Sequence, residues 1–240
     1  MNPIVIIPTY NECENIKRML ETVMSLQEPF DVLVVDDNSP DGTADLVKEA
    51  QAVYPRIHLL ENGKKNGLGG AYIAGFRWCL ARDYAYIFEM DCDFSHNPND
   101  LVRLHAELQK GDCDLVVGSR YVGNVVNVVN WPMSRVLLSY FASAYVRFFT
   151  RMMLADATAG FVGYSRKLLE TIDLKRIKFK GYAFQIEMKY TTHKLGFAIR
   201  EIPIIFTDRT EGVSKMNGGI IREALIGVIQ LRFKSIRPQT

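Results

Sequence analysis

Two carboxylates that lie one residue apart follow an apolar run of strand length. The run covers residues 85–90, and the carboxylates belong to Asp91-Cys92-Asp93. Carboxylate oxygens at this spacing suit a hard divalent cation such as Mg²⁺ or Mn²⁺. In open α/β sheets, ligands bind outside the carboxyl ends of the strands, where this pair would lie. An aspartate after a strand is also a common turn residue, so the pair alone leaves both interpretations open.

Three further apolar runs in the first half of the chain end in polar residues. Their motifs are Pro8-Thr9-Tyr10-Asn11-Glu12, Asp36-Asp37-Asn38-Ser39 and Gly118-Ser119-Arg120. Each has an ordinary alternative, such as a helix cap at Thr9 or Asn11 or a turn that begins at Asp36. Because the carboxyl ends of parallel strands meet at one edge of a sheet, the four motifs together indicate a nucleotide-binding crevice.

The elements that must position these residues alternate between strand and helix. This alternation is typical of an α/β fold with a mostly parallel sheet and helices on both faces. Strands are expected at 3–8, 31–36, 56–60, 85–90, 114–118, 159–164 and 198–206. Helices are expected near 13–26, 42–53, 69–82, 98–110, 182–195 and 218–233. No linker or repeat divides the 240 residues, so we expect one domain, with a nucleotide-binding half at about 1–120 and an acceptor-facing, membrane-facing half at about 121–240.

Composition excludes several classes of protein. With 29 basic and 27 acidic residues, the net charge of +2 gives no argument for nucleic acid as a partner. Four separated cysteines without a C-x-x-C pair favour a reduced cytoplasmic protein over a disulfide framework or a zinc site. The chain enters its first apolar run directly, which favours a strand there over a signal peptide. Gly67-Leu68-Gly69-Gly70 lacks the last glycine of the dinucleotide fingerprint, so a Rossmann dehydrogenase is disfavoured.

A long apolar segment, Met133 to Leu154, predicts contact with a lipid surface. At about 1.5 Å per residue a helix here would reach about 33 Å, enough to cross a bilayer. Arg135, Arg147 and Arg151 interrupt it, and charges at the bilayer centre are unfavourable. The apolar residues at helical spacing are Met133, Val136, Leu137, Tyr140, Phe141, Ala144 and Phe148. We therefore expect an amphipathic interfacial helix whose arginines reach lipid phosphates, with a buried core helix as the alternative and residues 220–233 as a weaker second candidate.

The strand-end motifs resemble those of the inverting GT-A glycosyltransferases of family 2. Three more stretches, at 131–135, 181–187 and 206–215, are similar to dolichyl-phosphate (polyprenyl-phosphate) mannosyltransferases, especially the short form without transmembrane helices. The resemblance covers residues 3 to about 233, and its most specific part is the D-R-x-x-G-x-S-K run that ends at Lys215. It implies a GT-A (Rossmann-like) fold and Mg²⁺ or Mn²⁺ as cofactor.

The resemblance implies a role for each matching position. The base and ribose of the nucleotide sugar are expected against Pro8, Tyr10, Glu12, Val35 and Asp37. The sugar diphosphate is expected against Asp91, the Cys92 backbone and Asp93, with Arg120, Arg209 and Lys215 beside the phosphates. Asp91, Asp93, Arg209 and Lys215 form the expected catalytic set.

The implied metal ligand is Asp93. Longer family members often have Gln two residues later, where this chain has Ser95, so Ser95 is a weaker candidate. The middle residue of the motif is usually Ala and is Cys92 here, a change that a role through the backbone tolerates. His96 is close enough in sequence to approach the metal, but we favour a hydrogen bond within the loop.

Arg135 and Ser139, four residues apart, would share one helix face and are candidates to bind the acceptor phosphate, with Arg120 assisting. Each cation has an ordinary alternative: Arg120 could pair with a surface acid, and Arg209 and Lys215 could be solvated loop charges.

The implied reaction transfers mannose from GDP-mannose to a polyprenyl phosphate with inversion. A phosphate monoester has a second pKa of about 6, so this acceptor is already anionic and needs no general base. Such an enzyme would be cytoplasmic and peripheral on the cytoplasmic face of a membrane, with a small membrane-anchoring protein as a further candidate partner. Two alternatives stay open: a family 2 transferase that uses UDP-glucose or UDP-N-acetylglucosamine, and a non-catalytic nucleotide-binding subunit that recruits a membrane partner.

Overall fold

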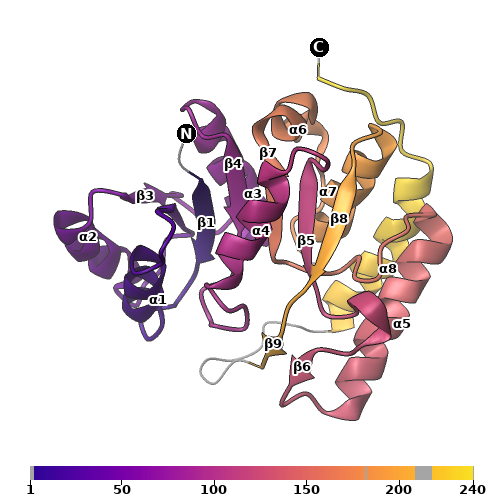
Figure 1. Cartoon of the computed structure of the whole chain (residues 1–240), viewed down its shortest axis with the longest axis horizontal. Helices are drawn as coiled ribbons and strands as arrows, with labels where there is room; N and C mark the ends of the chain where they lie inside the picture. Colours follow the sequence, from indigo (N-terminus) through magenta and orange to yellow (C-terminus); the bar gives the residue numbers. More distant parts are fainter. Residues whose placement is uncertain (1–2, 182, 209–217, 240) are drawn as a thin grey trace.

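A seven-stranded sheet forms the centre of the computed structural model, which describes residues 3–181, 183–208 and 218–239 (Figure 1). The strands are β1 (Ile4–Thr9), β2 (Asp31–Asp36), β3 (Ile57–Glu61), β4 (Tyr86–Glu89), β5 (Leu115–Ser119), β7 (Val162–Ser165) and β8 (Ile199–Pro203). Their order is β3-β2-β1-β4-β7-β5-β8. All neighbours pair in parallel except β7, which is antiparallel to both β4 and β5. The expectation of a mostly parallel sheet is confirmed.

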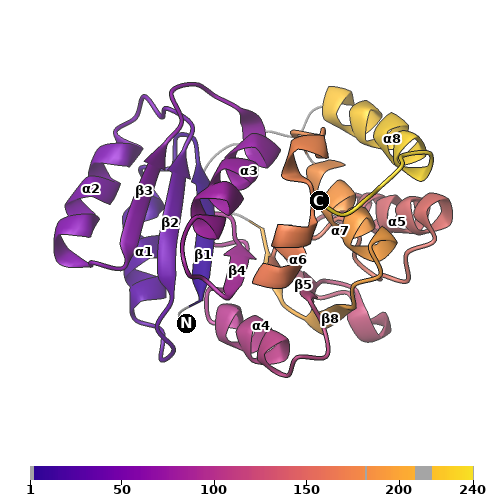
Figure 2. The same cartoon turned by 90° about the horizontal axis from the view of Figure 1, so that it is seen from above.

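Helices cover both faces of this sheet, as Figure 2 shows from above. One face is covered by α3 (Gly67–Leu80), α6 (Arg166–Thr171) and α7 (Ala183–Lys194), and the other by α1 (Ile16–Met24), α2 (Thr43–Val53) and α4 (Asp100–Gln109). Strand β1 explains why two layers are needed. Ile4 and Ile6 belong to the first core and Val5 and Ile7 to the second, so the run is apolar at every position rather than at alternate ones.

The chain beyond residue 120 adds two long helices beside the sheet. Helix α5 (Met133–Thr150) packs against α8 (Gly218–Arg232), and the Tyr145 hydroxyl donates to the Leu225 carbonyl at 3.0 Å. Beside the lower end of α5 in Figure 1, β6 (Val128–Val129) pairs with β9 (Phe206–Thr207) in a small separate sheet. Two short 3₁₀ turns, η1 (Val122–Asn124) and η2 (Leu174–Arg176), complete the described elements. None of the helices in the described ranges combines the length and apolarity that crossing a membrane requires.

Several expected elements differ from those observed. Helix α1 begins at Ile16 rather than near 13, because a turn comes first in which the amides of Asn15 and Ile16 both donate to the Glu12 carbonyl. The strand expected at 198–206 divides into β8 and β9. The strand expected at 159–164 begins at Val162 and leads directly into α6, which the sequence did not predict.

The long apolar segment is helical only as far as Thr150. Arg151 takes the left-handed conformation (φ +59°) and its amide donates to the Arg147 carbonyl, which ends the helix. The Arg147 guanidinium donates to the carbonyls of Leu154 and Ala155. Contact of the arginines with lipid phosphates stays a prediction.

Candidate active site

The first two strand-end motifs are tied together by Asp36. Its carboxylate accepts from the Thr9 hydroxyl at 2.8 Å and from the amide and hydroxyl of Ser39 at 2.8 and 2.6 Å. Thr9 is therefore not the cap of α1. Asp36 instead joins the end of β1 to the turn after β2, which holds the two loops of the crevice in a fixed relation.

Asp37 ties the end of β2 to the loop before α3. Its carboxylate accepts from the Asn62 side chain at 2.9 Å and from the amides of Asn66 and Gly67 at 2.9 and 3.0 Å. Beside it, the Lys65 ammonium lies 3.6 Å from the centre of the Tyr10 ring, a cation–π contact. The role of Asp37 at the ribose stays a prediction, and the observed bonds show that it also holds the loop before α3 against the end of β2.

The other residues expected at the base and ribose differ in exposure. Pro8, Tyr10 and Glu12 are half-buried at the end of β1. The Val35 side chain is fully buried in the core beneath α3, so it supports this part of the crevice from below.

Asp91 and Asp93 line one pocket of about 80 Å³ at the carboxyl edge of the sheet. The same pocket is lined by Ser95, Arg120 and Arg135, which come from three different parts of the chain. The structure thus brings together five of the residues expected at the diphosphate, the metal and the acceptor phosphate, whereas Ser139 does not line this pocket. Cys92 does not share in the lining, since its side chain is buried in the core on the α4 side.

The donor set of this pocket fits a divalent metal. The Ser95 hydroxyl oxygen is buried without a hydrogen-bond partner, and the Ser95 amide donates to an Asp93 carboxylate oxygen at 3.1 Å. No group of three His, Cys, Asp or Glu side chains suited to a metal occurs within the described residues. Mg²⁺ is commonly held by one or two carboxylates together with substrate phosphates, and Asp91 and Asp93 match that kind of site.

Arg120 is held by a buried acid that the sequence did not single out. Its Nε and Nη2 donate to the two carboxylate oxygens of Asp156, both at 2.7 Å, and Nη2 also donates to the Thr158 hydroxyl at 2.9 Å. Burial raises the pKa of Asp156, but the charge and hydrogen bonds of Arg120 outweigh burial and bring the pKa below its usual value. The alternative in which Arg120 pairs with a surface acid is therefore wrong, because its partner Asp156 is fully buried, and Arg120 also lines the pocket.

Arg135 reaches the pocket from the first turn of α5. Its Nη1 donates to Asp208 at 2.7 Å, and its guanidinium lies 4.2 Å from the centre of the Trp131 ring. Ser139 lies one helical turn further along α5 and is half-buried. Arg209 and Lys215, the remaining expected phosphate ligands, lie outside the described residues.

His96 is a buried neutral side chain beside the carboxylates. Burial is the main cause that lowers the pKa of His96 to about 4, and the charge of Arg120 lowers it further while Asp93 opposes the shift. The ring stacks on Phe161 at 5.0 Å, and Nδ1 has no hydrogen-bond partner among the described residues. The hydrogen bond that we favoured for this side chain is thus not formed at Nδ1, although the His96 backbone bridges to Phe206 of β9.

Comparison with known proteins assigns the chain to a family. Residues 4–173 match the family model described as glycosyl transferase family 2. The chain belongs to glycosyl transferase family 2. The narrower resemblance is also confirmed: an undecaprenyl-phosphate mannosyltransferase from Micrococcus luteus is 46% identical over 228 residues, which cover 95% of this chain and 93% of the relative. A polyprenol monophosphomannose synthase from Mycolicibacterium smegmatis is 46% identical over 229 residues, which cover 95% of this chain and 85% of the relative.

The fold of this family 2 glycosyltransferase also matches a solved structure. Glucosyl-3-phosphoglycerate synthase from Mycobacterium tuberculosis, in complex with Mn²⁺, uridine diphosphate and glucosyl-3-phosphoglycerate, superposes with a TM-score of 0.72. The identity is 17%, and the match covers 98% of this chain and 81% of the other. This likeness confirms the expected GT-A type of α/β fold.

Two polar residues of this glycosyltransferase site were missed by sequence reasoning. Asp156 lies among the small residues of Ala155-Asp156-Ala157-Thr158-Ala159, where no motif marks it. Gln185 lies in a stretch that we used for the family resemblance without giving it a role, and it lines the pocket beside Asp91 and Asp93.

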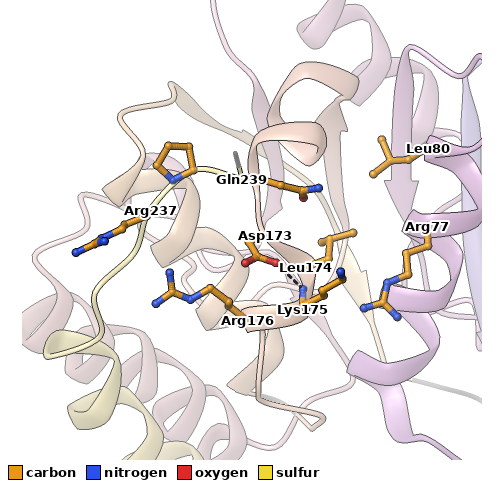
Figure 3. Close-up of a pocket in the computed structure, with 9 residues that line it drawn as sticks. Arg77, Leu80, Asp173, Leu174, Lys175, Arg176, Arg237 and Gln239 are labelled. Carbon is orange, nitrogen blue, oxygen red and sulfur yellow. Dashed lines mark hydrogen bonds between the residues drawn. The ribbon is translucent and has the colours of Figure 1, made fainter.

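A larger groove in the family 2 domain lies away from these residues (Figure 3). It has a volume of about 640 Å³ and is lined by Arg77 and Leu80 of α3, by η2 and by residues 237–239. Helix α3 begins beside Asp37 at the carboxyl edge of the sheet and ends at Leu80, so this groove lies toward the opposite edge. None of the expected site residues lines this groove, so the volume of a cavity does not by itself identify the candidate active site.

Proposed function

We propose that this protein transfers mannose from GDP-mannose to a polyprenyl phosphate, with inversion and with the help of a divalent metal. The observation that carries the proposal is the 46% identity, across 95% of the chain, to two enzymes named for polyprenyl-phosphate mannose synthesis. The pocket at the carboxyl edge supports it, because the carboxylates of Asp91 and Asp93 and the guanidiniums of Arg120 and Arg135 converge there.

Departure of the nucleoside diphosphate requires that its negative charge be neutralised. A bound Mg²⁺ or Mn²⁺ would supply this charge neutralisation as a Lewis acid. Asp93 and Asp91 would hold that ion, with the Ser95 hydroxyl as an additional oxygen donor. Arg209 and Lys215 are proposed to approach the same phosphates, and Pro8, Tyr10, Glu12, Val35 and Asp37 to surround the base and ribose.

The acceptor side of the pocket favours an acceptor that is already ionised. Among its described lining residues, the carboxylates are those of Asp91 and Asp93, which the metal and diphosphate would occupy. The His96 ring is buried, and its pKa of about 4 makes it a weak base. Arg135 and Ser139 on α5 would place a phosphate by charge and hydrogen bonding, so no separate group for proton removal is needed.

An apolar surface beside the pocket supports a peripheral position on the membrane. On α5, Met133, Leu137, Tyr140, Phe141 and Phe148 are exposed and fall within about 100° of one another at 100° per residue. On α8, Leu225, Ile226 and Ile229 are exposed in the same way, and Phe233 follows the helix. We refer to these nine residues as the apolar surface. A lipid acceptor would enter from this side, and we propose the cytoplasmic face as the location.

Transfer of labelled sugar into an organic phase tests the proposal. The purified protein, Mg²⁺ or Mn²⁺ and a polyprenyl phosphate are incubated in parallel with GDP-mannose, UDP-glucose and UDP-N-acetylglucosamine. Extractable label from GDP-mannose alone is the expected result. Label from a UDP-sugar would replace the donor and keep the mechanism. Nucleotide binding without label, even after a membrane fraction is added, would favour a non-catalytic subunit, whereas label that appears with that fraction would reveal an anchoring partner.

A further inference from the structure

A buried amide forms part of the pocket wall beside the two carboxylates. Gln185 is the third residue of α7, its side chain is 2% exposed, and it lines the same pocket as Asp91 and Asp93. A polar side chain buried to this extent is normally held by several hydrogen bonds. Its partners therefore show which parts of the amide remain for a ligand.

Two fully buried ionisable side chains, Glu89 and Lys189, fix the orientation of this amide. Gln185 Nε2 donates to Glu89 Oε2 at 2.5 Å, and the Lys189 ammonium approaches Gln185 Oε1 at 3.4 Å. Lys189 also donates to the carbonyls of Ala159 at 2.6 Å and Gln185 at 3.3 Å, and Glu89 accepts from the Tyr164 hydroxyl at 3.2 Å. The amide nitrogen is thus directed to the acid and the amide oxygen to the cation.

The remaining capacity of the amide matches a hydroxyl group. A primary amide has two N–H donors and an oxygen with two lone pairs, and the contacts above use one donor and one lone pair. One donor and one acceptor remain on a side chain that lines the pocket. A phosphate oxygen only accepts, so it would leave the second lone pair of the amide oxygen unused, whereas a sugar hydroxyl both donates and accepts.

We infer that Gln185 binds a hydroxyl group of the sugar that is transferred, and that Glu89 and Lys189 act as positioning residues that hold its amide for this contact. The inference rests on the proposed function, because it requires a nucleotide sugar in this pocket. Helix α7 would then contribute to donor selection, because the Gln185 amide binds the sugar, while Asp91 and Asp93 lie at the diphosphate.

The test compares sugar donors that each lack one hydroxyl. Wild-type protein and Gln185→Met are assayed with the full donor and with its 2-, 3-, 4- and 6-deoxy analogues. For wild type, kcat/KM should fall about tenfold for the analogue that lacks the bound hydroxyl. Gln185→Met should show about that loss with the full donor and no further loss with that analogue. Equal losses for every analogue in both proteins would overturn the inference.

Two further variants separate sugar binding from folding. Gln51→Met changes a glutamine of α2 that donates to the Ile57 carbonyl outside the pocket, and it should leave the pattern of analogues unchanged. Lys189→Met should reproduce the selective loss in weaker form, whereas a purely structural role would lower turnover equally for all donors. If Gln185→Met no longer binds the nucleoside diphosphate, the inference is tested with the wild-type protein alone. Full wild-type activity with all four deoxy donors would overturn it.

The result also separates this inference from the proposed function. Turnover of UDP-glucose instead of GDP-mannose would refute the proposal that GDP-mannose is the donor. Deoxy analogues of UDP-glucose would then test whether Gln185 binds a sugar hydroxyl. Turnover of none of the three donors would refute the proposed function and this inference with it. Turnover of GDP-mannose with equal losses for all analogues would refute the inference alone.

Discussion

The acidic residues at the carboxyl edge of the sheet differ in what they contact. Asp36 and Asp37 accept hydrogen bonds from neighbouring loops and hold the crevice together. Asp91 and Asp93 line the pocket. Asp156 is fully buried and paired with Arg120. Substitutions at these positions should therefore have different consequences, which separate binding from stability.

Asp93→Ala should abolish turnover while the protein stays folded. The change removes the carboxylate that we expect to bind the metal directly, so turnover in Mg²⁺ or Mn²⁺ should fall at least about a thousandfold. Thermal unfolding should remain close to wild type because Asp93 is only partly buried. Asp83→Ala, an exposed aspartate before β4, is the matched control. Full activity of Asp93→Ala without added metal would refute the mechanism.

Asp156→Asn should destabilise the fold by about 3 kcal/mol, since it leaves the buried Arg120 charge without its partner. The pKa of Asp156 is lowered in the folded protein, so its ionisation stabilises the fold above the unfolded pKa of about 3.9. This contribution is lost as the pH falls through the lower folded value. Urea unfolding at pH 7 and at pH 3 measures both effects. A difference between the two proteins that does not shrink in acid would contradict the assignment.

At the residue scale, the sequence predicted the carboxylates that line the pocket. It did not predict the hydrogen-bond partners of the other pocket residues. Asp91 and Asp93 were recognisable because they follow a strand of a parallel sheet. The partner of Arg120 is 36 residues away and lies in a loop, so only the folded chain shows that Asp156 holds it. Gln185 was missed for a related reason, because its orientation depends on Glu89, which is 96 residues away.

The elements of the second half form the part of the molecule where we propose that the acceptor binds. The sequence predicted the helical spacing of α5, but it could not decide whether the apolar face is buried or exposed. The structure shows Ser143, Val146 and Thr150 packed inward, while the residues of the apolar surface remain exposed. Strand β9 was not separated from β8, and helix α6 was missed, because both are short and no periodic pattern develops over so few residues.

Phe141→Asp should weaken binding to lipid vesicles without changing nucleotide binding. Phe141 is 62% exposed on α5, and transfer of a phenylalanine side chain from water into an apolar phase is favourable by about 1.5–3 kcal/mol. A decrease of about tenfold or more in vesicle affinity is expected, measured by flotation. Val53→Asp is the matched control, because Val53 is 68% exposed on α2, outside the apolar surface. Equal weakening by both variants would count against a membrane role for α5.

At the scale of the whole molecule, the two halves share one sheet. Strand β7 comes from the second half, yet it lies between β4 and β5 of the first half and pairs with both. Strand β7 packs closely against β4, since a Cβ on Gly163 would lie 2.5 Å from the Phe88 ring. The sequence predicted a strand here but gave no sign of its direction or place, since a short apolar run can pair in either sense.

A fragment of residues 1–120 should therefore not fold as a unit. Without β7, strands β4 and β5 would each lose a neighbour and the sheet would be split between them. We expect no cooperative thermal transition for the fragment by circular dichroism, while the full chain unfolds cooperatively under the same conditions. A sharp transition in the fragment would show that the first half is an independent unit.

The apolar surface on α5 and α8 also determines how the purified protein should behave in a test tube. Large exposed apolar side chains associate with whatever apolar material is present, including detergent micelles, plastic and other copies of the chain. The apparent mass in gel filtration should therefore depend on the detergent and on the protein concentration. An oligomeric state measured by gel filtration without a detergent or lipid would reflect association through the apolar surface rather than a biological assembly.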